Sequence, residues 1–202
     1  MDLGASGRGE RTALLLLDFQ ADFLEAAGRL PVAQEQVPPM LEAANRLIDA
    51  APDLGLEVVY VGNEFSRWDL PANWFRHHAS LAGSPGAHLD RRLHVVNDRY
   101  FPKQAGNAFR NRDLDTFLRS QGVGRVILAG VFAHACVQAS ARGALRRGYR
   151  VAVLQDGVAT TSDRRRSAAL HRMHKLGAEI VTSKHVITCA DGSFGRPRAE
   201  GP

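Results

Sequence analysis

The fold is decided by residues 124–138, which read Gly124-Arg125-Val126-Ile127-Leu128-Ala129-Gly130-Val131-Phe132-Ala133-His134-Ala135-Cys136-Val137-Gln138. Residues 126–129 form a short apolar run with β-branched side chains, which is typical of a strand buried on both faces. Gly130 interrupts this run, and the apolar residues between 135 and 147 have helical spacing. The stretch therefore predicts a strand, a tight turn and a helix, with Cys136 in the first turn of the helix.

Cys136 is a candidate nucleophile because of this position. Free backbone N–H groups and the positive end of the helix dipole lie at a helix N-terminus, so a thiol there is expected to ionise more easily. The thiolate is the nucleophilic form of cysteine. A lone cysteine in apolar surroundings is also often a small core residue, and this stretch alone leaves both interpretations open.

Composition limits the class of protein. A chain of 202 residues with 45% hydrophobic and 23% charged residues fits one α/β domain, residues 1–202, with 1–10 and 190–202 as loose tails. No run approaches the ~18 apolar residues of a membrane span, and the first ten residues do not resemble a signal peptide, so we expect a cytoplasmic protein without membrane contact. The two cysteines form no disulfide framework or zinc motif. The net charge of +5 comes from scattered basic residues without a nucleic-acid reader motif, so we expect no nucleic-acid partner.

Strand and helix patterns alternate along the chain. We predict strands at residues 12–17, 56–62, 93–96, 126–129, 149–154 and 179–182, and helices at residues 34–52, 113–121, 135–147 and 163–176. This alternation predicts a parallel sheet with helices on both faces and right-handed crossovers. Residues 66–87 have no regular pattern; the aromatic side chains there, including Trp68 and Trp74, could wall a pocket, pack the loop down or face another subunit. A dinucleotide or P-loop fingerprint is absent from the sequence.

Three chemically useful residues each come after a predicted strand: Asp18, Lys103 and Cys136. Ligands of open α/β sheets bind at the carboxyl ends of the strands. Taken singly, Asp18 could cap a turn and Lys103 could be a solvated lysine. Together, a carboxylate and an ammonium beside a thiol supply the proton acceptor and the countercharge that thiol chemistry needs.

Four motifs in order resemble those of the isochorismatase-like cysteine hydrolases. Asp18-Phe19-Gln20 with Phe23 is similar to D-x-Q/N-x-x-F, residues 103–109 (KQAGNAF) to K-x-x-x-S/N-A-F, residues 130–137 (GVFAHACV) to G-V-x-T-x-x-C-V, and residues 151–160 to a later V-x-V-x-x-D-x-x-A-x segment. The resemblance covers about residues 11–185. It implies a three-layer α/β/α sandwich around a six-stranded parallel sheet of order 3-2-1-4-5-6, with Asp18 and Cys136 across one crevice.

The resemblance also implies a reaction and a site. Cys136 would attack a small amide, urea or carbamoyl group to form a thioester, Asp18 would move the proton, and Lys103 would stabilise the anionic pair. The backbone N–H groups of Phe132 and Cys136 would form the oxyanion hole, beside a cis peptide expected at Val131–Phe132. We expect no cofactor and no metal, a homo-oligomer (dimer or tetramer), and a substrate pocket lined by Phe19, Gln20, Phe23, Asn63, Glu64, Phe65, Phe109, Phe132 and His134. If Glu64 lines the pocket, a substrate with a cationic or N–H-rich end is favoured.

Two departures from the family pattern bear on function. The usual threonine three residues before the cysteine is Ala133, which supports an alternative in which the chain is a non-catalytic binding or assembly subunit. Nicotinamidases of the family carry D-x-H at a metal site, whereas this chain has Glu64-Phe65-Ser66, which argues against the metal and that activity. A further alternative is isochorismatase-type vinyl-ether hydrolysis, which the presence of Cys136 disfavours because true isochorismatases lack this cysteine.

Overall fold

A single parallel sheet organises the chain. The computed structural model describes residues 11–68 and 70–189, so the predicted tails at 1–10 and 190–202 lie outside the described residues. The strands are β1 (Arg11–Leu17), β2 (Leu56–Asn63), β3 (Tyr100–Lys103), β4 (Val123–Gly130), β5 (Arg150–Val158) and β6 (Glu179–Val181). All pairings are parallel and the order is β3-β2-β1-β4-β5-β6, which confirms the predicted topology. The order reverses between β1 and β4, which creates a switch point at their carboxyl ends.

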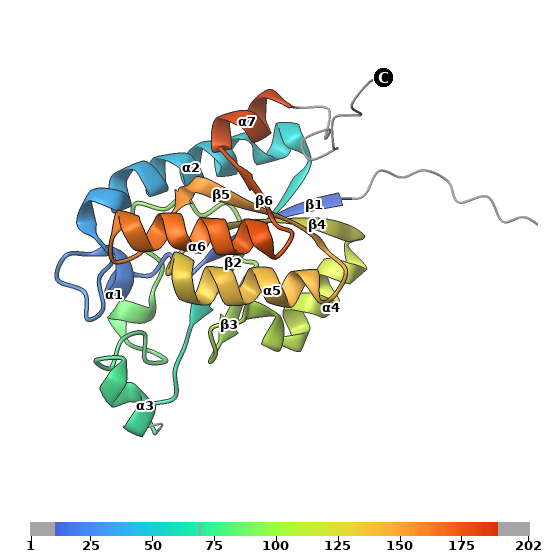
Figure 1. Cartoon of the computed structure of the whole chain (residues 1–202). Coiled ribbons are helices and arrows are strands. Elements are labelled where there is room, and N and C mark those ends of the chain that lie inside the picture. Colours follow the sequence, from blue (N-terminus) through green and yellow to red (C-terminus); the bar gives the residue numbers. More distant parts are fainter. Residues whose placement is uncertain (1–10, 69, 190–202) are drawn as a thin grey trace, which may run out of the picture.

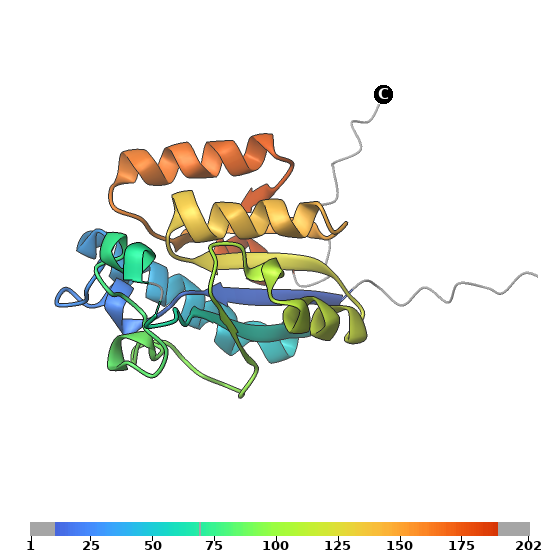
Figure 2. The ribbon, with the colours of Figure 1, turned by 90° about the horizontal axis from the view of Figure 1, so that it is seen from below.

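Helices cover both faces of the sheet (Figures 1 and 2). They are α1 (Ala21–Leu24), α2 (Val37–Leu54), α3 (Leu70–Phe75), α4 (Arg112–Ser120), α5 (Gln138–Leu145), α6 (Asp163–Lys175) and α7 (Ser183–Thr188). Side chains of β1 alternate: Leu14 and Leu16 join a core with α2 and α7, whereas Leu15 and Leu17 join a core with α4, α5 and α6. The predicted three-layer sandwich is therefore confirmed, with two hydrophobic cores separated by the sheet.

The third strand differs from the prediction at residues 93–96. Val95 and Val96 are 58% and 55% exposed, and the Tyr60 hydroxyl holds their segment by donating to His94 O at 2.9 Å and accepting from Val96 N–H at 3.1 Å. The strand itself lies later, at Tyr100–Lys103, and pairs with β2 alone. It contains Pro102, which lacks a backbone N–H and is tolerated because this is an edge strand.

Helix boundaries agree with local signals. Ser162 Oγ accepts from Arg165 N–H at 3.3 Å and so caps α6, and Gly177, with φ 99°, lies just past its end. The segment expected to be irregular contains α3 and a short 3-10 turn at Pro85–Ala87. None of the helices formed by the described residues is long and apolar enough to cross a membrane.

Residues 65–82 form an arm that carries α3 away from the sheet (Figure 1). Phe65 and Leu81 pair as an isolated bridge at its base, where Phe65 N–H donates to Ser80 O and Ala82 N–H donates to Phe65 O. Trp68, Trp74 and Phe75 are 82%, 76% and 83% exposed. These aromatic side chains are therefore not packed down onto the domain, and the two other interpretations, a pocket wall and a contact with another subunit, stay predictions.

Candidate active site

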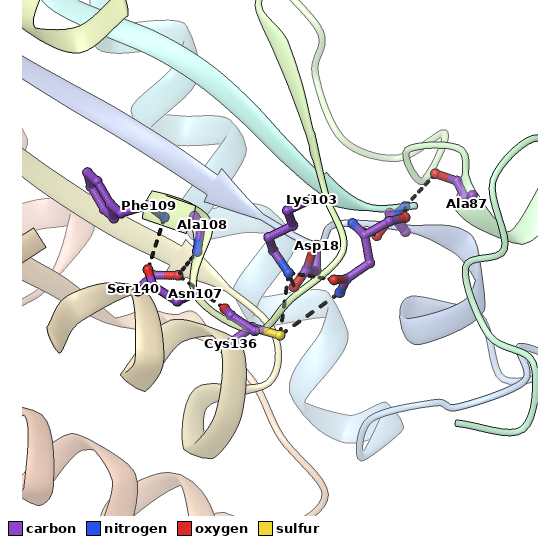
Figure 3. Close-up of polar contacts among 11 residues, drawn as sticks. Asp18, Ala87, Lys103, Asn107, Ala108, Phe109, Cys136 and Ser140 are labelled. Carbon is purple, nitrogen blue, oxygen red and sulfur yellow. Dashed lines mark hydrogen bonds and ion pairs between the residues drawn. The ribbon is translucent and has the colours of Figure 1, made fainter. Parts of the chain in front are cut away.

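Three strand ends bring the predicted catalytic side chains together (Figure 3). Asp18 comes directly after β1, Lys103 is the last residue of β3, and Cys136 comes after β4. Lys103 Nζ lies 2.9 Å from Asp18 Oδ2 and 3.5 Å from Cys136 Sγ. The Asp18 and Lys103 side chains are each 1% exposed, so this ion pair lies in a site that is nearly closed to solvent.

The turn that carries Cys136 is fixed by the neighbouring strands. Gly130 has φ 128°, and a Cβ there would collide with the carbonyl oxygen of Leu17, so glycine is required. Val131 N–H donates to Leu17 O at 3.0 Å, and the Val131–Phe132 peptide bond is cis. Cys136 lies in a π-helical turn, Ala133–Val137, and not in the first turn of an α-helix as predicted, because α5 begins only at Gln138. Single π-helical turns are frequent at functional sites.

Asn63 at the end of β2 joins the ionic cluster. Lys103 Nζ donates to Asn63 Oδ1 at 2.7 Å, and Asn63 Nδ2 lies 3.9 Å from Cys136 Sγ. The Gln20 side chain accepts from Asn63 N–H at 2.8 Å and donates to Asn63 O at 2.8 Å and Ala87 O at 2.6 Å. Gln20 is fully buried, so it braces Asn63 instead of facing a substrate as predicted.

The charges in the site are strongly coupled. Burial raises the pKa of Asp18, outweighing the attraction of Lys103. Burial, and then the charge of Asp18, raises the pKa of Cys136 to about 12 despite Lys103. Burial alone would lower the pKa of Lys103, but the charges of Asp18 and Cys136 raise it. The resting site therefore holds an ammonium and one negative charge that Asp18 and Cys136 compete for.

This electrostatic arrangement corrects the expectation for Cys136. The sequence predicted a thiol that ionises easily at a helix N-terminus, but the raised pKa of Cys136 means that the free site holds the protonated thiol. Burial removes solvation from the thiolate and the charge of Asp18 repels it, and together these two effects exceed the stabilisation by Lys103.

A cavity of about 590 Å³ adjoins Lys103. Its lining residues are Glu64, Ala82, Pro102, Lys103, Gln104, Ala105, Arg110 and Asn111. Two of them directly neighbour residues close to the sulfur: Glu64 comes after Asn63, and Ala105 precedes Gly106, at which an added Cβ would lie 4.0 Å from Cys136 Sγ. Among the lining residues, Lys103 carries its Nζ to 3.5 Å from Cys136 Sγ, so the cavity adjoins a direct neighbour of the nucleophile, and its volume suits a small molecule.

One wall of this cavity is bonded to the helix that begins after Cys136 (Figure 3). Ala108 N–H donates to Ser140 Oγ at 3.0 Å, and Ser140 Oγ lies 3.4 Å from Gly106 O. The Asn107 side chain accepts from Phe109 N–H at 2.9 Å, and its amide leaves no room for a Cβ at Gly143. Residues 104–111 and α5 are thus held together.

The predicted pocket residues are only partly brought together. Glu64 lines the cavity, but Phe19 and Phe109 are fully buried in the two cores and Phe23 is 3% exposed, so these three pack the fold. Phe132 is partly buried and meets Phe23 edge-on at 5.6 Å between ring centroids. Their apolar character indicated core as readily as pocket, as is usual for phenylalanine.

Phe65 and His134 lie elsewhere. Phe65 is held at the base of the arm, with the Arg76 guanidinium 3.9 Å above its ring. The His134 ring is hydrogen-bonded to Thr160 Oγ1 and faces a second cavity beside α6, whose lining includes Arg165 and Arg172. Burial, and then the charges of these arginines, lowers the pKa of His134.

Sequence reasoning missed Arg110 and the bonding role of Asn63. Arg110 stands directly after the K-x-x-x-S/N-A-F motif, which is the one signal that could have drawn attention to it.

Within residues 11–68 and 70–189, no group of three or more His, Cys, Asp or Glu side chains could hold a metal ion.

The chain belongs to the isochorismatase domain family, whose model matches residues 12–185. It is 27% identical, over 87% of its length and 94% of the relative, to an Arabidopsis thaliana protein called a probable inactive nicotinamidase. It is 26% identical to the maleamate amidohydrolase of Pseudomonas putida, over 90% of this chain and 87% of that protein. Among solved structures, N-carbamoylsarcosine amidase from Thermoplasma acidophilum is 29% identical and superposes with a TM-score of 0.74, covering 86% of this chain and 96% of that one.

Proposed function

We propose that the protein is a cysteine hydrolase that cleaves a C–N bond of a small amide, urea or carbamoyl substrate through a thioester. Relatives named as an amidohydrolase and an amidase support the reaction class. The observation that carries the proposal is the position of Lys103 Nζ, 2.9 Å from Asp18 Oδ2 and 3.5 Å from Cys136 Sγ in a buried site. Asp18 acts as the base, Lys103 as the countercharge and Cys136 as the nucleophile.

The first step is transfer of the thiol proton from Cys136 to Asp18. With a pKa of about 12, the thiol does not lose its proton to water near neutral pH. Asp18 is a stronger base than an ordinary carboxylate because burial raises its pKa, and its buried Oδ1 has no hydrogen-bond partner among the described residues. The transfer leaves one negative charge beside Lys103, so the net charge of the buried site does not change.

The thiolate then forms a bond to the carbonyl carbon, and the π electrons of the carbonyl move to its oxygen. The N–H groups of Phe132 and Cys136 are the proposed donors to this oxyanion. In support, the Phe132 N–H has no hydrogen-bond acceptor in the part of the chain that the structure describes. When the C–N bond breaks, the leaving amine takes the proton from Asp18.

Hydrolysis of the thioester restores the site. A water molecule gives a proton to Asp18 and adds to the carbonyl carbon, the C–S bond breaks, and the sulfur recovers the proton from Asp18. Ala133 does not prevent this sequence, because its side chain is fully buried and its N–H donates to Ala159 O at 2.9 Å, which braces the turn through the backbone. The hydroxyl usual at this position is therefore dispensable for the turn.

A substrate panel tests the proposal. Small amides, ureas and carbamoyl amino acids are incubated with the wild type, Cys136→Ala and the matched control Cys189→Ala, and release of ammonia or amine is measured. We expect release with the wild type and the control but not with Cys136→Ala. Trapping of the acyl group by hydroxylamine would report the thioester.

Two competing functions give different results in the same panel. A non-catalytic binding subunit would release nothing from any compound; Ala133 and the Arabidopsis relative called a probable inactive nicotinamidase favour this alternative. A vinyl-ether hydrolase would act on isochorismate and keep that activity in Cys136→Ala. We further propose a cytoplasmic homo-oligomer, dimer or tetramer, whose mass light scattering would measure.

A further inference from the structure

Two opposite charges line the cavity beside Lys103: the carboxylate of Glu64 and the guanidinium of Arg110. Glu64 lies just beyond β2, and Arg110 ends a 3-10 turn, Ala108–Arg110, on the other wall. Arg110 is exposed and Glu64 is half-buried. Both charges can therefore reach a molecule that enters the cavity.

Neither charge is neutralised by the protein. Within residues 11–68 and 70–189, Glu64 and Arg110 form no ion pair with each other or with another side chain. The nearby hydroxyl of Tyr100 stays protonated, because burial and then the charge of Glu64 raise its pKa. The protonated hydroxyl is neutral, so a hydrogen bond from it to Glu64 leaves the charge of the carboxylate in place. The cavity thus presents one negative and one positive group, both available to a ligand.

Both groups are close in the chain to atoms beside the nucleophile. Glu64 adjoins Asn63, whose Nδ2 lies 3.9 Å from Cys136 Sγ. Arg110 belongs to the segment 104–111, which includes Gly106 beside the sulfur and is bonded to α5 through Ser140. A ligand held between the two charges thus lies next to Lys103, whose Nζ is 3.5 Å from Cys136 Sγ.

We propose that the substrate is a zwitterion: a small amino acid that carries a terminal carboxamide or ureido group. The inference rests on the proposed hydrolase function and specifies its substrate class. Arg110 binds the carboxylate, for which a guanidinium offers two parallel donors, and Glu64 binds the ammonium. The carboxamide or ureido carbon then lies at Cys136. A cavity of about 590 Å³ holds such a molecule with room for water.

Three amides separate the two charge contacts. Asparagine carries both charges, succinamate lacks the ammonium, and 3-aminopropanamide lacks the carboxylate, while all three keep the same carboxamide. We expect kcat/KM to be highest for asparagine or for its longer homologue glutamine. Because a hydrogen bond to a charged group typically contributes enough to change a rate constant roughly ten- to hundredfold, each missing charge should cost about that factor.

Charge-removing variants test the assignment of each contact. Arg110→Gln should lower kcat/KM for asparagine and succinamate, which carry the carboxylate, and leave kcat/KM for 3-aminopropanamide unchanged. Glu64→Gln should lower kcat/KM for asparagine and 3-aminopropanamide, which carry the ammonium, and leave kcat/KM for succinamate unchanged. The matched controls Arg112→Gln and Glu35→Gln alter exposed residues outside the cavity lining and should change none of the three. Thermal unfolding shows whether each variant is folded.

Binding without turnover gives an independent measurement. In Cys136→Ala, calorimetric titration should show tighter binding of asparagine or glutamine than of the two singly charged amides. Adding Arg110→Gln should abolish the preference over 3-aminopropanamide and keep the preference over succinamate, which lacks the ammonium that Glu64 binds. If amides are hydrolysed in a Cys136-dependent way, but kcat/KM depends neither on the charges of the amide nor on Arg110→Gln and Glu64→Gln, this inference is overturned and the proposed function stands. If no amide, urea or carbamoyl compound is hydrolysed, the proposed function falls, and the inference falls with it.

Discussion

Replacement of Lys103 by methionine should destabilise the protein severely, because it leaves the Asp18 carboxylate buried without its partner. The two side chains are each 1% exposed and their charged atoms are 2.9 Å apart. Breaking a buried ion pair by removing one partner costs about 3–5 kcal/mol, out of a total stability of about 5–15 kcal/mol. For a chain of this size 1 kcal/mol shifts the melting temperature by about 2–4 °C, so Lys103→Met should melt about 6–20 °C below the wild type.

The measurement is thermal and urea unfolding monitored by circular dichroism, in a cycle with Asp18→Asn and the double variant. The double variant leaves no buried charge at either position, so it should recover most of the loss, and the two single effects should not add. The deficit of Lys103→Met should shrink as the pH falls from the raised folded-state pKa of Asp18 towards about 4 and be lost below that, since a carboxyl group with a raised folded-state pKa destabilises the fold only where the unfolded chain is ionised. A loss below about 1 kcal/mol would be that of a solvated surface pair and would refute the closed site.

Three more variants probe other parts of the site. Asn63→Leu removes the 2.7 Å acceptor of Lys103 and the amide beside the sulfur, so kcat should fall roughly 10- to 100-fold with little change in KM; a change in KM alone would indicate a substrate contact instead. Between pH 9 and 10.5 the free energy of unfolding of the wild type should decline with pH, because the raised pKa keeps the folded thiol of Cys136 protonated while the unfolded thiol ionises. In Cys136→Ser, urea unfolding should show a decline that is shallower by up to roughly 1.4 kcal/mol per pH unit. Parallel slopes in the two proteins would contradict this. Gly130→Ala should lower the melting temperature more than Gly122→Ala, since a Cβ collides with the Leu17 carbonyl only at Gly130; equal effects would show that the turn yields.

The central sheet could be predicted from sequence because its strands are buried on both faces. β1 and β4 each contain a continuous apolar run, at residues 13–17 and 126–129, and such a run can be recognised without knowing its neighbours. β3 could not be found in this way. It has four residues, one neighbour and a proline, whereas the preceding Val95 and Val96 imitate a strand although they are more than half exposed.

In the candidate site, too, the features that a sequence pattern contains could be predicted, whereas those that depend on neighbours in space could not. Asp18 and Cys136 follow strands that were predicted correctly, and the carboxyl ends of parallel strands meet at one edge of the sheet. Lys103 was joined to them by the ordered family motifs, because its own strand was predicted at residues 93–96. The pKa of Cys136 depends on burial and on the distance to Asp18, neither of which a sequence pattern contains. Phe19 and Phe109 were expected in the pocket but pack the cores, since their apolar side chains do not indicate which surface they meet.

The hydrogen bonds that Ser140 makes with Ala108 and Gly106 attach the segment 104–111, which lines one part of the cavity, to α5. The opposite wall, Glu64 and Ala82, flanks the base of the arm, which is closed by the pairing of Phe65 with Leu81. Insertions or substitutions in the arm between Phe65 and Leu81 can change which substrates the enzyme accepts without shifting Cys136 Sγ relative to Asp18. Changes in substrate preference should therefore accumulate in the arm, while the segment bonded to Ser140 changes slowly and keeps the catalytic side chains in place.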